Sequence, residues 1–216
     1  MLFACFPRPI LFEPNILNEN LETYEIEIKQ AISKVGSMRD SMLNVDSTHK
    51  LRENIFEVAR LKDLRQAIFF HATNFLQEIG YKNTDSLHFE NVWANISHKG
   101  DYLFPHVHNG SLLSGVYYVK CDMKDKIKFF NIPSMLPEPV EYNQYNAQFV
   151  EHTCIPGSLM MFTSDMLHGT EKQIGEEKIA ISFNTVSYTH LRAHETREDR
   201  VCPRGLVKKK GGGGGG

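Results

Sequence analysis

Three histidines have the residue type and the spacing of a metal site: His106, His108 and His168. In Pro105-His-Val-His the first two lie at i and i+2 of an extended segment, where alternate side chains point to the same side. His168 lies much farther along the chain, after a predicted strand. Three neutral imidazole nitrogens on one face suit Fe(II) or Zn(II) and leave coordination positions open. The pattern therefore predicts a metal centre.

A cation follows His168 on the next predicted strand, over residues 178–185. Lys178, Ala180 and Ser182 are two residues apart and therefore share one face of this strand, which places an ammonium group and a hydroxyl toward the cavity that His168 borders. A charge turned toward an apolar interior is costly unless an anion meets it. A dicarboxylate would supply that anion, so the strand predicts an anion site beside the metal.

The elements that position these residues change type near residue 85. Before it, the sequence predicts a strand over 10–13 and amphipathic helices over about 20–35 and 60–79. Between the helices it predicts a loop over 37–56 that can include a helical turn. These helices are expected to pack on one face of a sheet.

Beyond residue 85 short apolar segments alternate with turn residues such as Pro156-Gly157. In the first of these strands Leu87, Phe89, Trp93 and Asn95 are expected to share one face, and Trp93 is taken as a core residue. The strands are predicted over about 87–96, 111–120, 126–130, 149–155, 159–162 and 178–185. The fold class is therefore α+β, with an antiparallel jelly-roll (double-stranded β-helix) core and two N-terminal helices packed on it.

Four stretches within residues 87–185 resemble the 2-oxoglutarate/Fe(II) oxygenase superfamily, close to its prolyl-hydroxylase-like branch and to a set of bacterial and phage oxygenases. The stretches are Trp93-Ala-Asn-Ile, Pro105-His-Val-His-Asn-Gly-Ser-Leu-Leu-Ser-Gly-Val-Tyr-Tyr-Val, Pro156-Gly-Ser-Leu-Met-Met-Phe-Thr-Ser-Asp-Met-Leu-His-Gly and Ile179-Ala-Ile-Ser-Phe-Asn.

The resemblance implies a site in which His106, His108 and His168 hold Fe(II). Lys178 would bind the distal carboxylate of 2-oxoglutarate with the help of Tyr118 and its small polar neighbour Ser182. Asn95 would donate a further hydrogen bond to the cosubstrate. Two positions depart from the usual pattern. His108 stands where most of the superfamily has Asp or Glu, so it is either a third imidazole ligand or points away. Lys178 replaces the commoner Arg, which keeps the charge and loses the bidentate geometry.

The function that this resemblance implies is a 2-oxoglutarate-dependent dioxygenase that hydroxylates its substrate and releases succinate and CO2. A zinc-dependent hydrolase or lyase is an alternative, because three histidines also build zinc–hydroxide sites, but it gives Lys178 no role. A non-catalytic jelly-roll binding module with incidental histidines is a third possibility. In the dioxygenase reaction no side chain has to serve as a general base.

The end of the chain has a different character. From Val186 it reads VSYTHLRAHETREDRVCPRGLVKKKGGGGGG, whose start resembles one reading frame of a transposase-type sequencing adapter. We therefore expect residues 186–216 to be a non-native disordered tail and the native strand to continue about ten residues past Thr185. A genuine basic tail that binds nucleic acid is the alternative. The expected organisation is a support region over 1–84, a catalytic core over 85–185, and the tail.

The amino-acid composition limits the classes of binding partner that we expect. The tail holds 7 of the 24 Lys and Arg residues and 3 of the 26 Asp and Glu residues, which leaves a net charge of −6 on the rest. An acidic chain without a basic stripe argues against a nucleic-acid partner, and no apolar run reaches the roughly 18 residues of a membrane span. Cys5, Cys121 and Cys154 have neither disulfide nor zinc-finger spacing. We expect a cytoplasmic protein that acts on a small molecule or a protein side chain; the sequence fixes neither the substrate nor the oligomeric state.

Overall fold

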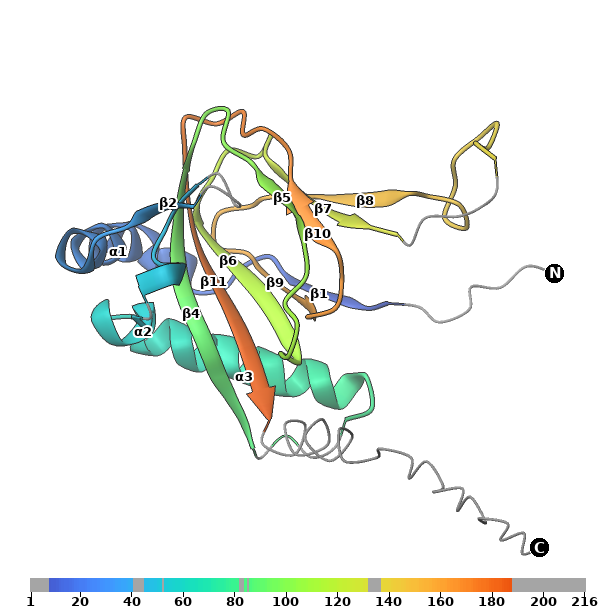
Figure 1. Ribbon diagram of the computed structural model, residues 1–216. Helices are drawn as coiled ribbons and strands as arrows, with labels where there is room; N and C mark the ends of the chain where they lie inside the picture. Colours follow the sequence, from blue (N-terminus) through green and yellow to red (C-terminus); the bar gives the residue numbers. More distant parts are fainter. Residues whose placement is uncertain are drawn as a thin grey trace, which may run out of the picture.

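Two antiparallel sheets form the body of the protein in the computed structural model, which describes residues 8–187 except 41–44, 52, 82, 83, 85 and 132–136 (Figure 1). The larger sheet has the strand order β1-β9-β6-β11-β4-β3-β2, and the smaller has the order β5-β10-β7-β8. The strands are β1 (Ile10–Glu13), β2 (Met38–Asp40), β3 (Val45–Ser47), β4 (Leu87–His98), β5 (Leu103–His106), β6 (Leu113–Lys120), β7 (Lys126–Phe130), β8 (Phe149–Thr153), β9 (Leu159–Thr163), β10 (His168–Thr170) and β11 (Glu177–Ser187).

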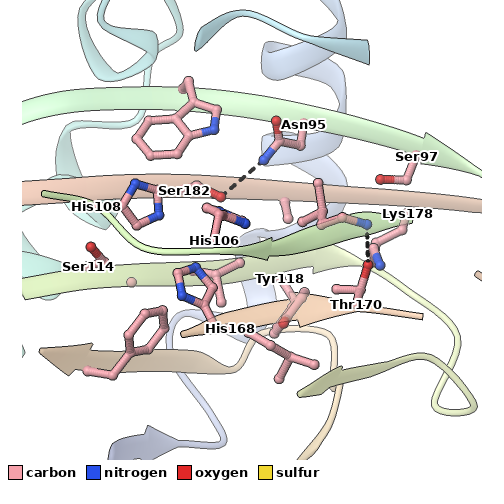
Figure 2. A pocket seen from close by; sticks show the side chains of 17 residues that line it. Asn95, Ser97, His106, His108, Ser114, Tyr118, His168, Thr170, Lys178 and Ser182 are labelled. Atoms are coloured by element: carbon pink, nitrogen blue, oxygen red, sulfur yellow. Dashed lines mark hydrogen bonds between the residues drawn. The ribbon is translucent and has the colours of Figure 1, made fainter. Parts of the chain in front are cut away.

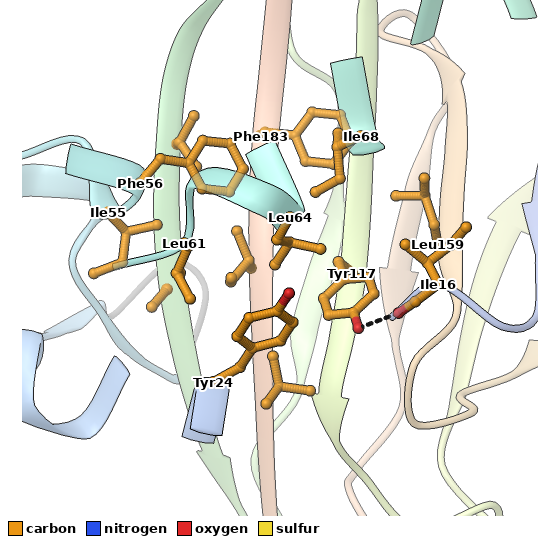
Figure 3. Close-up of a cluster of buried hydrophobic side chains, with 14 of the residues drawn as sticks. Ile16, Tyr24, Ile55, Phe56, Leu61, Leu64, Ile68, Tyr117, Leu159 and Phe183 are labelled. Carbon is orange, nitrogen blue, oxygen red and sulfur yellow. Dashed lines mark hydrogen bonds between the residues drawn. The ribbon is translucent and has the colours of Figure 1, made fainter. Parts of the chain in front are cut away.

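The helices α1 (Leu21–Val35), α2 (Ile55–Val58) and α3 (Lys62–Glu78) lie together on one side of the larger sheet (Figure 1). Their apolar faces and the outer face of this sheet bury one continuous core, part of which Figure 3 shows. Within it, Tyr117 satisfies its buried hydroxyl by donating a hydrogen bond to the backbone oxygen of Ile16 at 2.6 Å. The predicted fold class, a jelly-roll core with N-terminal helices on it, is confirmed. Among the described residues no helix is long and apolar enough to cross a bilayer.

A second core lies between the two sheets and is smaller. Its buried members come mainly from β6, β7 and β9, and include Val116, Tyr118, Phe129 and Phe162. This core fills only part of the space between the sheets. The rest is a cavity whose lining includes residues of β5 and β10, so the fold itself creates a site between the two sheets.

Strands β4 and β11 form the longest antiparallel pair and carry one wall of that cavity. Trp93 pairs with Ser182, Asn95 with Ala180, and Ser97 with Lys178. The side chains of these six residues all line the cavity. The alternation predicted for residues 178–182 is therefore confirmed, and alternate residues of the neighbouring strand β4 face the same cavity.

The predicted face of β4 is wrong at its first half. Leu87 and Phe89 pack with the helices, whereas Trp93 and Asn95 face the cavity. The register explains the change: Asn184 pairs with Asn91 and Thr185 with Phe89, which leaves Glu90 as an extra residue. A β-bulge of this kind shifts the alternation by one residue and so moves the following side chains to the other face.

Three further expectations need correction. The predicted loop over 37–56 contains β2 and β3, because β3 pairs with β4 and extends the larger sheet, whereas the short 3-10 helix His49–Leu51 agrees with the helical turn expected there. Strands β5 and β10 were not predicted as strands at all. Finally, β11 continues through Val186 and Ser187, which pair with His88 and Leu87, so the strand includes the first two residues of the predicted tail. Residues 188–216 lie outside the described part of the chain.

Candidate metal centre and cosubstrate cavity

The three histidines meet at one end of the cavity. His106 ends β5 and pairs directly with His168, which begins β10. His108 follows two residues after β5, and its backbone N–H donates to the carbonyl of Ser164 at 2.9 Å, which ties this loop to the turn before β10. One ring nitrogen from each histidine lies within 4.8 Å of the others. The chain therefore brings together all three ligands that the sequence predicts (Figure 2).

Backbone carbonyls orient two of the three rings. Nδ1 of His106 lies 2.7 Å from the carbonyl oxygen of Phe104, and Nδ1 of His168 lies 2.8 Å from that of Met166. A carbonyl oxygen only accepts, so Nδ1 carries the proton in both rings. Nε2 then has a free lone pair, which is the arrangement that second-shell acceptors impose on metal-binding histidines.

Burial keeps two of the rings neutral. Desolvation, together with the neighbouring His106, lowers the pKa of His168 from 6.5 to about 3, and the same causes lower the pKa of His108 to about 4. Both imidazoles are therefore uncharged near neutral pH and available as ligands. Three neutral nitrogen donors fit Fe(II), and they fit Zn(II) equally well.

These pKa shifts predict an acid-sensitive metal-free protein. Above pH 6.5 His168 and His108 are neutral in both the folded and the unfolded protein. Below pH 6.5 these histidines become protonated in the unfolded chain but stay neutral in the folded protein, so the free energy of unfolding falls between pH 6.5 and about 3 to 4. At pH 5 the buried His168 alone should cost about 2 kcal/mol of unfolding free energy relative to pH 7. Thermal unfolding at both pH values should therefore show a smaller loss in metal-free His168→Asn than in the parent protein. Equal losses would contradict the expectation.

Lys178 lies at the other end of the same cavity, beside Thr170 (Figure 2). The residue is only 6% exposed. Its ammonium makes no hydrogen bond or ion pair with any residue in the described part of the chain. A buried cation without a partner is unfavourable, so the cavity presents an unsatisfied positive charge opposite the histidines.

The remaining predicted contacts lie between these two ends. Asn95 Nδ2 donates to Ser182 Oγ at 3.1 Å across the β4–β11 pair. Tyr118 also lines the cavity. Desolvation raises the pKa of its phenol well above 10, so the hydroxyl stays neutral, and this hydroxyl is hydrogen-bonded to Cys154. All seven predicted site residues thus face one cavity. Their roles stay predictions, since geometry alone does not assign a ligand.

Trp93 and Thr170 are among the cavity residues that the sequence reasoning missed. Trp93, interpreted as core, lines the cavity with its ring centroid 5.8 Å from that of His108, and its Nε1 is buried without a partner among the described residues. Thr170 was not singled out, and its hydroxyl accepts from the backbone N–H of Leu103 at 2.9 Å. The i, i+2 relation of Trp93 to Asn95 was a usable signal, whereas Thr170 depends on a strand too short to predict.

The sequence within this site also matches a known family. Residues 91–184, from β4 to β11, match the family described as "Putative 2OG-Fe(II) oxygenase". This part of the chain belongs to the 2OG-Fe(II) oxygenase family. The family uses Fe(II) and 2-oxoglutarate, and the predicted membership is confirmed. The matched segment contains the three histidines, Lys178 and the other residues that line the cavity.

Solved structures agree with this domain in fold. A prolyl hydroxylase from Trichoplax adhaerens, in complex with a hypoxia inducible factor peptide, superposes with a TM-score of 0.62 over 85% of this chain and 86% of that one, at 11% identity. A Pseudomonas putida prolyl-4-hydroxylase gives 0.57 over 83% and 93%, at 13% identity.

HygX from Streptomyces hygroscopicus, solved with nickel and 2-oxoglutarate bound, gives a TM-score of 0.56 over 84% of this chain and 83% of that one, at 9% identity. Identities this low establish the shared fold and nothing about the substrate. No curated protein sequence matches the chain.

Proposed function

We propose that this oxygenase-family protein is an Fe(II)- and 2-oxoglutarate-dependent dioxygenase that hydroxylates its substrate. One oxygen atom of O2 would enter the substrate as a hydroxyl group, and the other would enter succinate as 2-oxoglutarate loses CO2. The metal with its cosubstrate supplies this oxidation, while the protein supplies binding, orientation and a dry cavity.

Lys178 is the observation that carries the proposal. It is a buried basic residue with no hydrogen-bond or ion-pair partner among the described residues, and it faces the same cavity as the triad. A ligand that offers a carboxylate at this end and metal-binding oxygens at the other would satisfy both ends at once. 2-Oxoglutarate is such a ligand, and a zinc hydrolase would leave the lysine without a role.

The metal would be held by His106 and His168 through Nε2, since carbonyl oxygens occupy their Nδ1 protons. His108 would be the third ligand, because its ring nitrogen lies within 4.8 Å of theirs and burial keeps it neutral. Three protein ligands leave positions open for the cosubstrate and oxygen.

Tyr118, Asn95 and Ser182 would complete cosubstrate binding. The neutral phenol of Tyr118 is a donor at any physiological pH, and rotation of its hydroxyl away from Cys154 would bring it to the carboxylate that Lys178 meets. The acidic chain favours a small molecule or a protein side chain over nucleic acid as the group that is hydroxylated. A cytoplasmic setting fits the free thiols of Cys121 and Cys154.

Anaerobic titration tests this function directly. Adding Fe(II) and then 2-oxoglutarate should produce a visible metal-to-ligand charge-transfer band that neither component gives alone with the protein. Admission of O2 should then convert 2-oxoglutarate to succinate, measured by mass spectrometry. Absence of the band with both Fe(II) and Co(II) would reject the proposal. Ester or amide hydrolysis by the zinc-loaded protein would favour the hydrolase instead.

A further inference from the structure

Two polar atoms in the cavity wall lack partners among the described residues: Nε1 of Trp93 and Oδ1 of Asn95. Both residues are at least 94% buried and line the cavity of the triad and Lys178. They lie at i and i+2 of β4 and so share one face of the strand. Buried polar groups in folded proteins are nearly always paired, so two orphans on one wall point to a missing partner inside the cavity.

A change of side-chain orientation can give the Asn95 amide oxygen a hydrogen-bond donor. Its Nδ2 donates to Ser182 Oγ, which leaves Oδ1 without a donor. Because the amide oxygen and nitrogen are nearly equal in size, a half turn of the amide lets the Ser182 hydroxyl donate to Oδ1. Nδ2 then directs its N–H groups into the cavity. In this arrangement Ser182 is a positioning residue that acts through Asn95.

Trp93 has no such alternative, because an indole N–H only donates. The position of Trp93 along β4 shows whether it lies at the Lys178 end or at the histidine end of the cavity. Ser97, which pairs with Lys178, lies four residues farther along β4, or roughly 13 Å at the usual rise of a strand. Trp93 instead lies beside His108, with the two ring centroids 5.8 Å apart. The unpaired donor is therefore at the histidine end.

We propose that the Trp93 indole N–H donates a hydrogen bond to an oxygen atom at the 2-oxo-acid end of the cosubstrate, with the turned Asn95 amide as a second donor beside it. This inference rests on the proposed function. The carboxylate and keto oxygens at that end are acceptors only, so a wall of N–H donors complements them. Lys178 recognises one end of the cosubstrate, and Trp93 recognises the other.

Nuclear magnetic resonance tests this in the unaltered protein. Trp93 is the only tryptophan in the chain, so ¹⁵N-labelled protein gives a single tryptophan indole signal. With Zn(II) as a diamagnetic substitute for Fe(II), 2-oxoglutarate should move this signal downfield. Pyruvate, which lacks the distal carboxylate, should move it in the same direction. An indole signal that stays in place while other cavity signals shift overturns the inference. If no signal shifts with either acid, the proposed function itself fails.

Binding by variants gives an independent result. Trp93→Phe should weaken both 2-oxoglutarate and pyruvate about tenfold, because one hydrogen bond to a charged group is lost. Lys178→Met should weaken 2-oxoglutarate alone. Tyr145→Phe, which changes an exposed aromatic side chain outside this cavity, is the matched control and should change neither. Calorimetric titration of the Co(II)-loaded proteins measures all three, and wild-type affinity of Trp93→Phe for pyruvate would overturn the inference.

Discussion

Replacing Lys178 with methionine should raise the Kd for 2-oxoglutarate by about 100-fold, equivalent to about 3 kcal/mol, because a buried carboxylate loses its charged partner. The same change should stabilise the cosubstrate-free protein, since it replaces an unpartnered buried cation with an apolar side chain of similar length. Affinity and stability should therefore move in opposite directions. The charge-transfer titration measures the first, and thermal unfolding without ligand measures the second.

The matched control for this change is Lys99→Met. Lys99 is 64% exposed and pairs with Glu176 at the surface, at 2.8 Å. Exposed pairs of this kind contribute little, so the variant should keep both the Kd and the melting temperature. If Lys178→Met binds 2-oxoglutarate as tightly as the parent protein does, Lys178 is not the carboxylate site, and the proposed function loses its main support.

Replacing His168 or His106 with alanine should weaken Fe(II) binding by at least about 100-fold, since loss of a second-shell contact alone costs 10- to 100-fold in metal sites. Succinate formation should disappear with the metal. His98→Ala is the matched control, because the His98 side chain is 54% exposed and lies outside the cavity. Competition against a coloured chelator measures the affinities.

His108 gives the sharper version of this experiment. If it ligates, His108→Ala should weaken Fe(II) binding as strongly as His168→Ala, and His108→Asp should restore binding by returning the carboxylate that most of the superfamily has at this position. The geometry favours that outcome, because a ring nitrogen of His108 lies within 4.8 Å of ring nitrogens of His106 and His168. A His108→Ala variant that binds Fe(II) normally would show that two histidines suffice.

The chemistry of the site was predictable from the sequence to an unusual degree. Side-chain alternation in strands is a local property, so the spacing of His106 and His108, and of Lys178 and Ser182, predicts which residues share a face. Helix periodicity is local in the same way, and the helices at 21–35 and 62–78 follow it. The sequence by itself therefore determined the candidate ligands, the charge beside them and the α+β class.

Only the tertiary structure decided how these parts meet. The bulge at Glu90 sets the face of Trp93 and Asn95, and it exists only in the register between β4 and β11. Strands β5 and β10 are too short to show a pattern, and pairing between them places His106 opposite His168. Within the described part of the chain, the Trp93 N–H lacks a partner and Lys178 is buried in the same cavity, and both are likewise properties of an enclosed space. Whether a polar group has a partner depends on residues distant in the chain, which no local pattern records.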